Sequence, residues 1–347
     1  MNIKPDPDEN QIGGISPTLP HLSAPWVIGI ARKRYKNRKG RTLPLQSDKP
    51  TLIRICSFAL ITAFCKKQGE AMYQYKNLEQ TSLHEISQCL NCAFSDYPLP
   101  THLSENELSA LFSASGVDKN LSFGAFFNGT LIGFMFHSCG LYQGYRSAFN
   151  VATGVIPTHR GKQVFTEIFS LAQRTLRQQQ IEQYYLEVLQ ENERAIALYK
   201  RQGFSITREF VVLSGSIPKG IRPSKPVQYS DLAAFDFQQA ADFHRNKPSY
   251  EHSDHVLWLH PDRYEVAFIK EQSLSAWCIF SKETGQIFQF GWNGIEDLRE
   301  VVLALLLRYP HVTAKNIESD QQQVLEMLGS LFFKVVAKQY EMIQALD

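Results

Sequence analysis

The chain has 347 residues, of which 44% are hydrophobic and 20% are charged. The length suggests two domains, and the composition excludes a collagen, a coiled coil and a wholly disordered chain. Six cysteines are too few for a disulfide scaffold. Residues 1–71 contain 12 basic and 5 acidic residues, whereas the remainder contains 24 and 29. The basic excess therefore belongs to the leader and does not indicate a nucleic-acid-binding body.

The leader, residues 1–71, is interpreted as a disordered or artefactual segment. It is rich in proline, and seven of the ten residues in 32–41 are basic. Such a run is typical of a solvated arm, and it leaves open a tail that binds nucleic acid. The apolar stretch at 55–65 is too short to span a membrane and stands too far along the chain for a signal peptide. We therefore expect a cytoplasmic protein without membrane contact.

From Met72 onward, strand-like and helix-like patterns alternate. The apolar residues of 160–179 recur at helical spacing and form one stripe. In chain order, we expect a strand opening at Met72, helices over 82–94 and 104–112, strands over 121–127, 131–137 and 148–156, a helix over 160–179, a strand over 184–189, a helix over 193–200 and a strand over 205–213. This order predicts an α/β (α+β) fold in which helices cover a mixed sheet, with residues 72–214 as the first domain.

Residues 215–226, which are rich in glycine and proline, are interpreted as a linker to a second domain over 227–347. That region repeats the pattern of the first domain more weakly. We expect helices over 230–244, 295–308 and 321–328, strands over 264–269, 275–281 and 286–290, and a final strand pair or bulged strand over 332–342. The second half therefore reads as a degenerate copy of the first.

The chemically informative segment begins where a strand ends at Ile156-Pro157. A short loop leads into Arg160-Gly161-Lys162, which opens the long helix. Free backbone N–H groups at a helix N-terminus bind anions, and Gly161 allows close approach of a ligand. The loop therefore has the features of a pyrophosphate site, although an ordinary helix start with two solvated basic residues would look the same.

Three elements follow one another at a specific spacing: Val-Ile-Pro-Thr-His-Arg-Gly-Lys at 155–162, Tyr-Leu-Glu-Val at 185–188, and Asn-Glu-Arg-Ala-Ile-Ala-Leu-Tyr-Lys-Arg-Gln-Gly-Phe at 192–204. Their order resembles the acyl-CoA core of the GNAT superfamily of acetyl-CoA-dependent N-acetyltransferases. The strong match covers about 50 residues, and compatible elements extend over 72–214. The resemblance implies direct acetyl transfer to a primary amine, with acetyl-CoA as acyl donor and no metal.

The resemblance also implies roles for individual residues. Glu187 would be the general base and Tyr199 the acid that protonates the departing thiolate of coenzyme A, and a carboxylate and a phenol on opposite sides of the reacting carbon suit this chemistry. A solvent-facing Glu187 and a structural Tyr199 are the alternatives. Cofactor contacts are expected from the backbone of Val155 and Ile156, from Arg160, Gly161, Lys162, Gln163, Val164 and Phe165, and from Asn192.

The loop departs from the family pattern at two places. Gln163 and Phe165 stand where the family has glycine, and glycine or alanine. A side chain at the first of these places crowds the diphosphate, although the N–H donors remain. The sequence therefore leaves open a non-catalytic acyl-CoA-binding or interaction protein with a decayed phosphate loop.

Asp96 and Tyr97 lie between the first two helices, which wall the acceptor pocket in this superfamily. Asp96 is a candidate for attracting an amine cation, with a simple turn as the alternative. Small-molecule and peptide amines both remain open as acceptors. In the second half, Trp292-Asn293-Gly294 precedes the helix at 295 in place of an Arg-Gly-x-Gly loop. We therefore expect a structural or substrate-shaping second domain. Cys89 and Cys92 are read as buried apolar residues rather than metal ligands.

Overall fold

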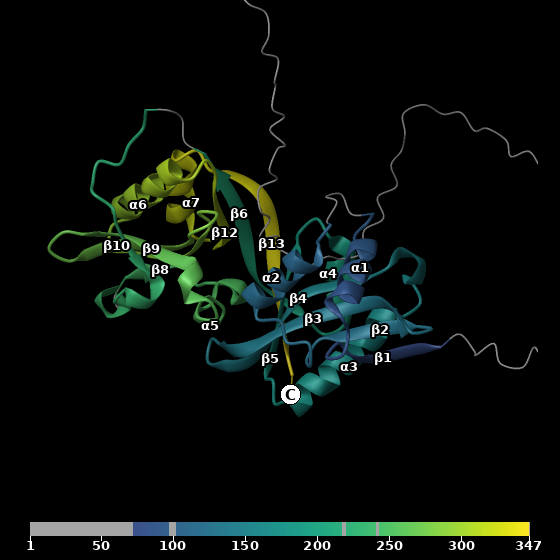
Figure 1. Ribbon diagram of the computed structural model, residues 1–347. Coiled ribbons are helices and arrows are strands. Elements are labelled where there is room, and N and C mark those ends of the chain that lie inside the picture. Colours follow the sequence, from purple (N-terminus) through teal and green to yellow (C-terminus); the bar gives the residue numbers. More distant parts are fainter. Residues whose placement is uncertain (1–71, 97–101, 217–219, 241–242, 347) are drawn as a thin grey trace, which may run out of the picture.

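The computed structural model describes residues 72–346, apart from 97–101, 217–219 and 241–242. In this part of the chain, one mixed sheet of 13 strands runs through the whole molecule, with helices on both faces (Figure 1). The expected α/β architecture is confirmed. The leader lies outside the described residues, as does Tyr97.

The first half follows the expected order closely. Its elements are β1 (Tyr73–Asn77), α1 (Leu83–Ala93), α2 (Glu105–Ser115), β2 (Phe123–Phe127), β3 (Thr130–Tyr142), β4 (Tyr145–Val155), α3 (Val164–Gln178), β5 (Gln183–Leu189), α4 (Glu193–Arg201) and β6 (Ser205–Gly215). Ser82 and Ser104 form capping boxes at the starts of α1 and α2, and such boxes satisfy the free N–H groups of a first helical turn.

The second half contains β7 (Gln228–Asp231), β8 (His244–Arg245), α5 (Asp254–Leu257), β9 (Tyr264–Lys270), β10 (Leu274–Ser281), β11 (Ile287–Trp292), α6 (Ile295–Arg308), β12 (Val312–Glu318), α7 (Gln322–Ser330) and β13 (Lys334–Ala345). The described part of the expected helix at 230–244 consists instead of short strands and single 3₁₀ turns. Its aromatic residues Phe235 and Phe237 pack around Trp277, so their spacing reflects a hydrophobic cluster and not a helical stripe.

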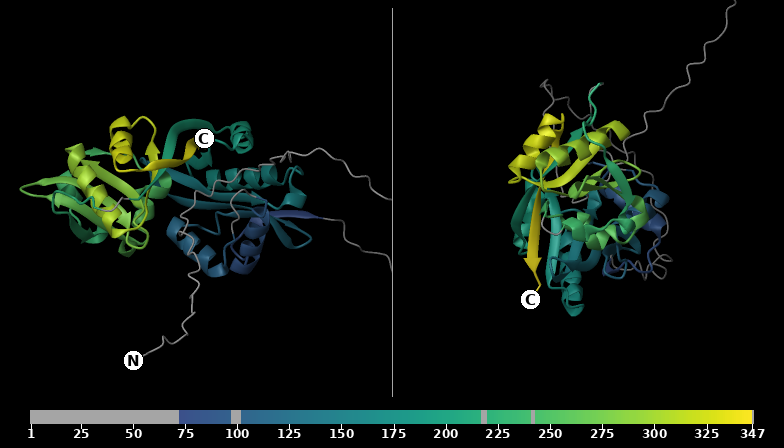
Figure 2. Two further views of the ribbon diagram at one scale, coloured as in Figure 1. Left: turned by 90° about the horizontal axis from the view of Figure 1, so that it is seen from above. Right: turned by 90° about the vertical axis from the view of Figure 1, so that its left-hand side faces the viewer.

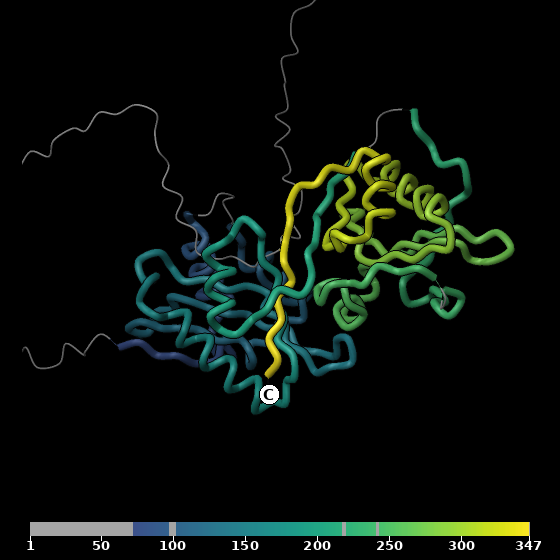
Figure 3. The backbone as a smooth tube through the Cα atoms, turned by 180° about the vertical axis from the view of Figure 1, so that it is seen from behind, coloured from purple at the N-terminus to yellow at the C-terminus, as the bar shows by residue number. Residues whose placement is uncertain are grey.

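The order of the strands in the sheet is β1-β2-β3-β4-β5-β13-β6-β12-β11-β10-β9-β7. The two halves of this order correspond to each other: β1 to β5, followed by β13, stand in one half as β7, β9, β10, β11 and β12, followed by β6, stand in the other. The last strand of each half is exchanged: β13 lies between β5 and β6, and β6 lies between β13 and β12. The two exchanged strands run side by side between the halves (Figure 3). The predicted boundary at 215–226 therefore separates β13 from the strands that it pairs with.

Hydrophobic clusters fill both faces of the sheet. In the first half, α1 and α2 cover one face, around Phe134, and α3 and α4 cover the other, around Tyr184. In the second half, α6 and α7 cover one face, and turns near α5 pack on the other. The halves lie on either side of the exchanged strands when seen from above (Figure 2). No helix among the described residues has the length and apolarity needed to cross a membrane.

Candidate active site

Strands β4 and β5 diverge after a short parallel pairing. The pairing runs from Ser147 with Gln183 to Phe149 with Tyr185, whereas β4 continues to Val155 and β5 to Leu189. The register between β3 and β4 also shifts near this point: Phe136 faces Ala152, and His137 faces Asn150. Val151 is therefore the extra residue of a β-bulge, which bends a strand and leaves one residue outside the ladder. Beyond Phe149 and Tyr185 the two strands are no longer paired, and we call the place where they part, within the first half of the sheet, the wedge.

The backbone groups of Val155 and Ile156, which were expected to contact the cofactor, already form hydrogen bonds within the protein. The N–H of Ile156 donates to the carbonyl of Ile132, and the carbonyl of Ile156 accepts from the N–H of His159, each at 3.0 Å. The carbonyl of Val155 accepts from Nε of Arg160 at 2.9 Å. A ligand strand along the wedge would therefore have to pair mainly before Ile156.

The loop before α3 presents unmet N–H groups. Gly161 has φ 75° and Gln163 has φ 61°, so the helix begins only at Val164. Side chains cap α1, α2 and α4, whereas no described side chain caps α3. The first N–H groups of a helix have no partner within it, and together with the helix dipole they favour an anion. The loop that the sequence assigned to the diphosphate therefore precedes a helix start without a side-chain cap, where an anion would be favoured.

The two atypical residues of this loop face in different directions. The side chain of Phe165 is buried and stands edge-on to Tyr199, with ring centroids 5.7 Å apart. Its bulk is therefore placed in the core and not over the N–H groups. Gln163 is exposed at the surface, and its left-handed backbone is uncommon for a residue other than glycine. Lys162 is also exposed, and Val164 is buried.

Arg160 and Asp96 contact each other. The guanidinium of Arg160 donates to both carboxylate oxygens of Asp96, at 2.7 and 2.9 Å, and to the carbonyl of Ala93 at 2.6 Å. The sequence assigned Arg160 to the cofactor and Asp96 to the acceptor. The structure brings the two together in a clamp between the loop and the end of α1.

Tyr199 lies on α4 and is 2% exposed. Its hydroxyl accepts from Nδ2 of Asn150 at 3.4 Å, and Oδ1 of Asn150 accepts from the Thr153 hydroxyl at 2.9 Å. Both partners belong to β4 beside the bulge. Burial raises the pKa of Tyr199 to about 12, so the phenol keeps its proton at neutral pH. Asn192 caps α4, because its side-chain oxygen accepts from the N–H of Ala195 at 3.3 Å.

Glu187 is 1% exposed and faces away from Tyr199. Its neighbours Leu186 and Val188 pack in the same cluster as Tyr199, and alternate residues of a strand point to opposite faces. The alternative that Glu187 faces solvent is therefore wrong. The carboxylate and the phenol lie on opposite sides of the sheet, next to the wedge between β4 and β5.

The surroundings of Glu187 hold its proton strongly. Burial is the main cause that raises its pKa to about 8, with a further contribution from Glu251; Lys315 and a hydrogen bond with Ser249 act in the opposite direction. Oε2 accepts from Nδ2 of Asn316 at 2.9 Å, whereas Oε1 is buried without a hydrogen-bond partner among the described residues. One carboxylate oxygen is thus engaged and the other is free to accept.

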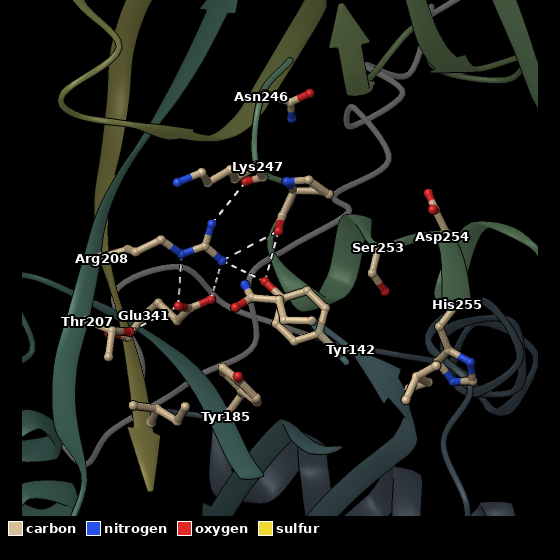
Figure 4. A pocket seen from close by; sticks show the side chains of 14 residues that line it. Tyr142, Tyr185, Thr207, Arg208, Asn246, Lys247, Ser253, Asp254, His255 and Glu341 are labelled. Carbon is tan, nitrogen blue, oxygen red and sulfur yellow. Dashed lines mark hydrogen bonds and ion pairs between the residues drawn. The ribbon is translucent and has the colours of Figure 1, made fainter. Parts of the chain in front are cut away.

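A cavity of about 650 Å³ lies between the two halves on the Glu187 side of the sheet. Tyr142, Arg208 and Glu341 stand on one side of it, and Ser253 and His255 on the other (Figure 4). The guanidinium of Arg208 donates to both oxygens of Glu341, at 2.9 and 2.5 Å, and to Glu318 at 2.7 Å. The cavity therefore has a polar wall that ties three strands together.

Sequence reasoning missed the polar residues around both candidate catalytic groups. Asn150 and Thr153 lie within a buried strand, and Asn316 lies in β12, which was not expected at all. The only sequence signal for Asn316 is the polar pair Lys-Asn that stands between Ala314 and Ile317. Among the described residues, no three His, Cys, Asp or Glu side chains form a metal-binding group. Cys89 is buried as expected, whereas Cys92 is exposed.

Comparison with known proteins gives a consistent result. Residues 83–204 match the sequence model of the acetyltransferase (GNAT) family, and no curated protein matches the chain. A GCN5-related N-acetyltransferase structure from Sphaerobacter thermophilus aligns with 79% of this chain and 96% of its own at 14% identity and a TM-score of 0.57. One from Anabaena variabilis aligns with 80% and 73% at 13% identity and a TM-score of 0.55.

A tandem GNAT protein from the clavulanic acid biosynthesis pathway aligns with 80% of this chain and 99% of its own, at 9% identity and a TM-score of 0.57. At these identities the solved structures establish a shared fold. Residues 83–204 are therefore similar to the GNAT acetyltransferase family, and the chain shares its two-part fold with a tandem GNAT protein.

Proposed function

We propose that the protein transfers an acetyl group from acetyl-CoA to a primary amine. The observation that carries this proposal is the placement of Glu187 and Tyr199, a buried carboxyl group and a buried phenol, on opposite faces of the sheet beside the wedge between β4 and β5. An amine must lose a proton to attack a thioester, and the departing thiolate must gain one, so two groups on opposite sides suit the reaction.

The residues of the α3 loop fit the donor. Acetyl-CoA, when bound, supplies the thioester carbonyl that the amine attacks. The uncapped N–H groups that follow Gly161 would hold its diphosphate, with Lys162 adding positive charge at the surface. Asn192, at the start of α4, and the backbone of β4 before Ile156 would line the arm. The clamp between Arg160 and Asp96 would hold the loop in place.

Glu187 would take the proton that the amine nitrogen loses as the new C–N bond forms. Its pKa of about 8 makes it a stronger base than an ordinary carboxylate, once it is ionised. Oε1, which has no hydrogen-bond partner in the described part of the chain, is the oxygen that would accept this proton. Because the side chain is buried, the proton reaches it through a relaying water or after neighbouring side chains move. The cavity beside Glu341 is where we expect the acceptor to enter.

Tyr199 would supply the proton that the sulfur of coenzyme A gains as the C–S bond breaks. Its high pKa keeps the hydroxyl a donor throughout the neutral range. Asn150 and Thr153 fix the position of that hydroxyl beside the bulge at Val151. The bulge leaves Val151 outside the regular ladder, and its backbone N–H would then be a candidate donor to a developing oxyanion.

The complete burial of Glu187 also favours a second candidate, a protein that binds acyl-CoA without transferring the acyl group. Isothermal titration calorimetry with acetyl-CoA, combined with acetyl-CoA consumption in a panel of amines, distinguishes the two. Transfer predicts both binding and amine-dependent consumption. Binding with no consumption for peptide, polyamine, lysine and aminoglycoside acceptors would favour the second candidate.

A further inference from the structure

The second half of the chain surrounds the candidate base. Asn316 donates to Glu187, and Ser249 accepts from the same amide at 2.8 Å. We propose that Asn316 and Ser249 are positioning residues that hold Glu187 for proton transfer, so that the second half supplies part of the active site. This inference rests on the proposed function.

A β-bulge in β12 places the Asn316 side chain next to Glu187. Ala314 faces Leu213 of β6 and Ile317 faces Val211, so that Lys315 and Asn316 share the single partner Val212. Consecutive residues of a regular strand point to opposite faces. Here both reach the same buried cluster: the Lys315 ammonium lies 3.5 Å from Glu251, and the Asn316 amide lies 2.9 Å from Glu187.

The backbone of Asn316 adopts an uncommon conformation to achieve this. Its φ is 57°, in the left-handed region, which asparagine tolerates better than most residues. Left-handed residues other than glycine cost free energy and persist where the surrounding structure enforces them. The side chain is 2% exposed, so its donor group is directed into the protein and not toward solvent.

The charges around Glu187 explain why a neutral donor matters there. Glu251 and Glu341 oppose its ionisation, and Lys315 favours it; Arg208 lies beyond, bound to Glu341. Both amide hydrogens of Asn316 are used, one for Oε2 of Glu187 and one for Ser249. Asn316 and Ser249 therefore favour the ionised carboxylate and fix its plane, and among the described residues Oε1 is left as the oxygen without a hydrogen-bond partner.

The test uses the full chain and the pH profile of kcat/KM. Asn316→Gly removes the amide and suits the left-handed backbone. A hydrogen bond to a charged group contributes enough that its loss raises the pKa of the carboxylate by about one to two units. The acid limb of the profile should move to higher pH by that amount. At pH 7, kcat/KM should therefore fall by about 10- to 100-fold, and the loss should become smaller as the pH rises. Ser249→Ala should move the acid limb in the same direction by a smaller amount. If Asn316→Gly does not fold, the shift in Ser249→Ala is the measurement that tests the proposal.

Asn91→Gly is the matched control. The Asn91 side chain on α1 forms hydrogen bonds with both backbone groups of Leu103, and within the described residues no hydrogen bond links it to Glu187. This variant should lose thermal stability without a shift of the acid limb. Wild-type protein without turnover on any amine would count against the proposed function. Wild-type turnover with an unmoved acid limb in Asn316→Gly and Ser249→Ala would overturn the positioning role.

A second measurement needs no acetyl transfer. The stability deficit of Asn316→Gly relative to wild type should grow as the pH rises through the range in which Glu187 ionises. That growth should disappear when both proteins also carry Glu187→Gln, because glutamine does not titrate. A deficit with the same pH dependence in both backgrounds would overturn the inference, whatever the enzyme assays show.

Discussion

Arg208 on β6 and Glu341 on β13 form a two-point ion pair between the exchanged strands, with nitrogen–oxygen distances of 2.9 and 2.5 Å. The same guanidinium binds Glu318 of β12 at 2.7 Å and the hydroxyl of Tyr142 at 2.6 Å. Residues from both halves of the chain thus meet at one buried cation. The contact fixes the sheet at the place where the halves exchange strands.

Replacing Arg208 with methionine should therefore be strongly destabilising. The substitution keeps an apolar stem but leaves the buried carboxylate of Glu341 and the partly buried carboxylate of Glu318 without their partner. Removing one member of a buried ion pair typically costs about 3–5 kcal/mol. Urea unfolding followed by circular dichroism measures the change. Arg174→Met, at an exposed position of α3, should change the unfolding free energy by less than about 0.5 kcal/mol; equal effects of the two substitutions would contradict this assignment.

Deleting residues 334–347 should prevent the first half from folding, although the deletion lies more than 100 residues after it. β13 pairs with β5 and β6 along most of its length, so its loss exposes two unpaired strand edges, which promote aggregation. The truncated protein should lack a cooperative thermal transition. A sharp transition near the wild-type temperature would show that β13 is dispensable and that the halves fold independently.

The sequence predicted this architecture unevenly. The first half was predictable because α1 and α2 carry capping boxes and α3 carries a continuous apolar stripe. The exchange of β6 and β13 was not, because strand pairing between distant segments leaves no local pattern. The segment 230–244 was misread because its aromatic residues pack around Trp277 at irregular spacing. β12 was missed because Lys315 and Asn316 interrupt its apolar residues.

The candidate site was predictable to a similar degree. Glu187 and Tyr199 became candidates through the resemblance to the GNAT superfamily, and both are buried, on opposite faces of the sheet, beside the β4–β5 wedge. The spacing gave no indication that Asp96 is bound by Arg160, because the residues are 64 positions apart. Asn316 lies 129 positions from Glu187, and only the three-dimensional fold brings them together.

The α3 loop should bind acetyl-CoA through charge as well as through its N–H groups. Lys162→Glu places a negative charge beside the uncapped helix start and should weaken acetyl-CoA binding by about tenfold at low salt, less at high salt. Calorimetry at two ionic strengths measures both effects. Lys200→Glu, at an exposed position of α4, is the control. If both variants bind acetyl-CoA as wild type does, the diphosphate does not lie at this loop.

Glu187 should impose a pH dependence on stability. Its pKa in the folded protein, about 8, is above the ordinary value of 4.5, so the folded state keeps a proton that the unfolded state loses. The free energy of unfolding should therefore fall as the pH rises from about 4.5 to 8, and level off above. Glu187→Gln should lack this fall, and urea denaturation from pH 5 to 9 compares the two proteins. Parallel curves would show that Glu187 ionises normally in the folded state.

The most direct test of acetyl transfer is the turnover of Tyr199→Phe. The substitution keeps the buried ring and its contact with Phe165 and removes only the hydroxyl. General acid help is typically responsible for about 10²–10⁴-fold in rate. We predict that, with the best acceptor of the amine panel, Tyr199→Phe lowers kcat by that factor while acetyl-CoA affinity and the thermal midpoint stay close to wild type. Tyr309→Phe, which removes a hydroxyl bonded to the Lys282 carbonyl in the second half, should turn over normally. Turnover of Tyr199→Phe at the wild-type rate would contradict the assignment of Tyr199 as the acid.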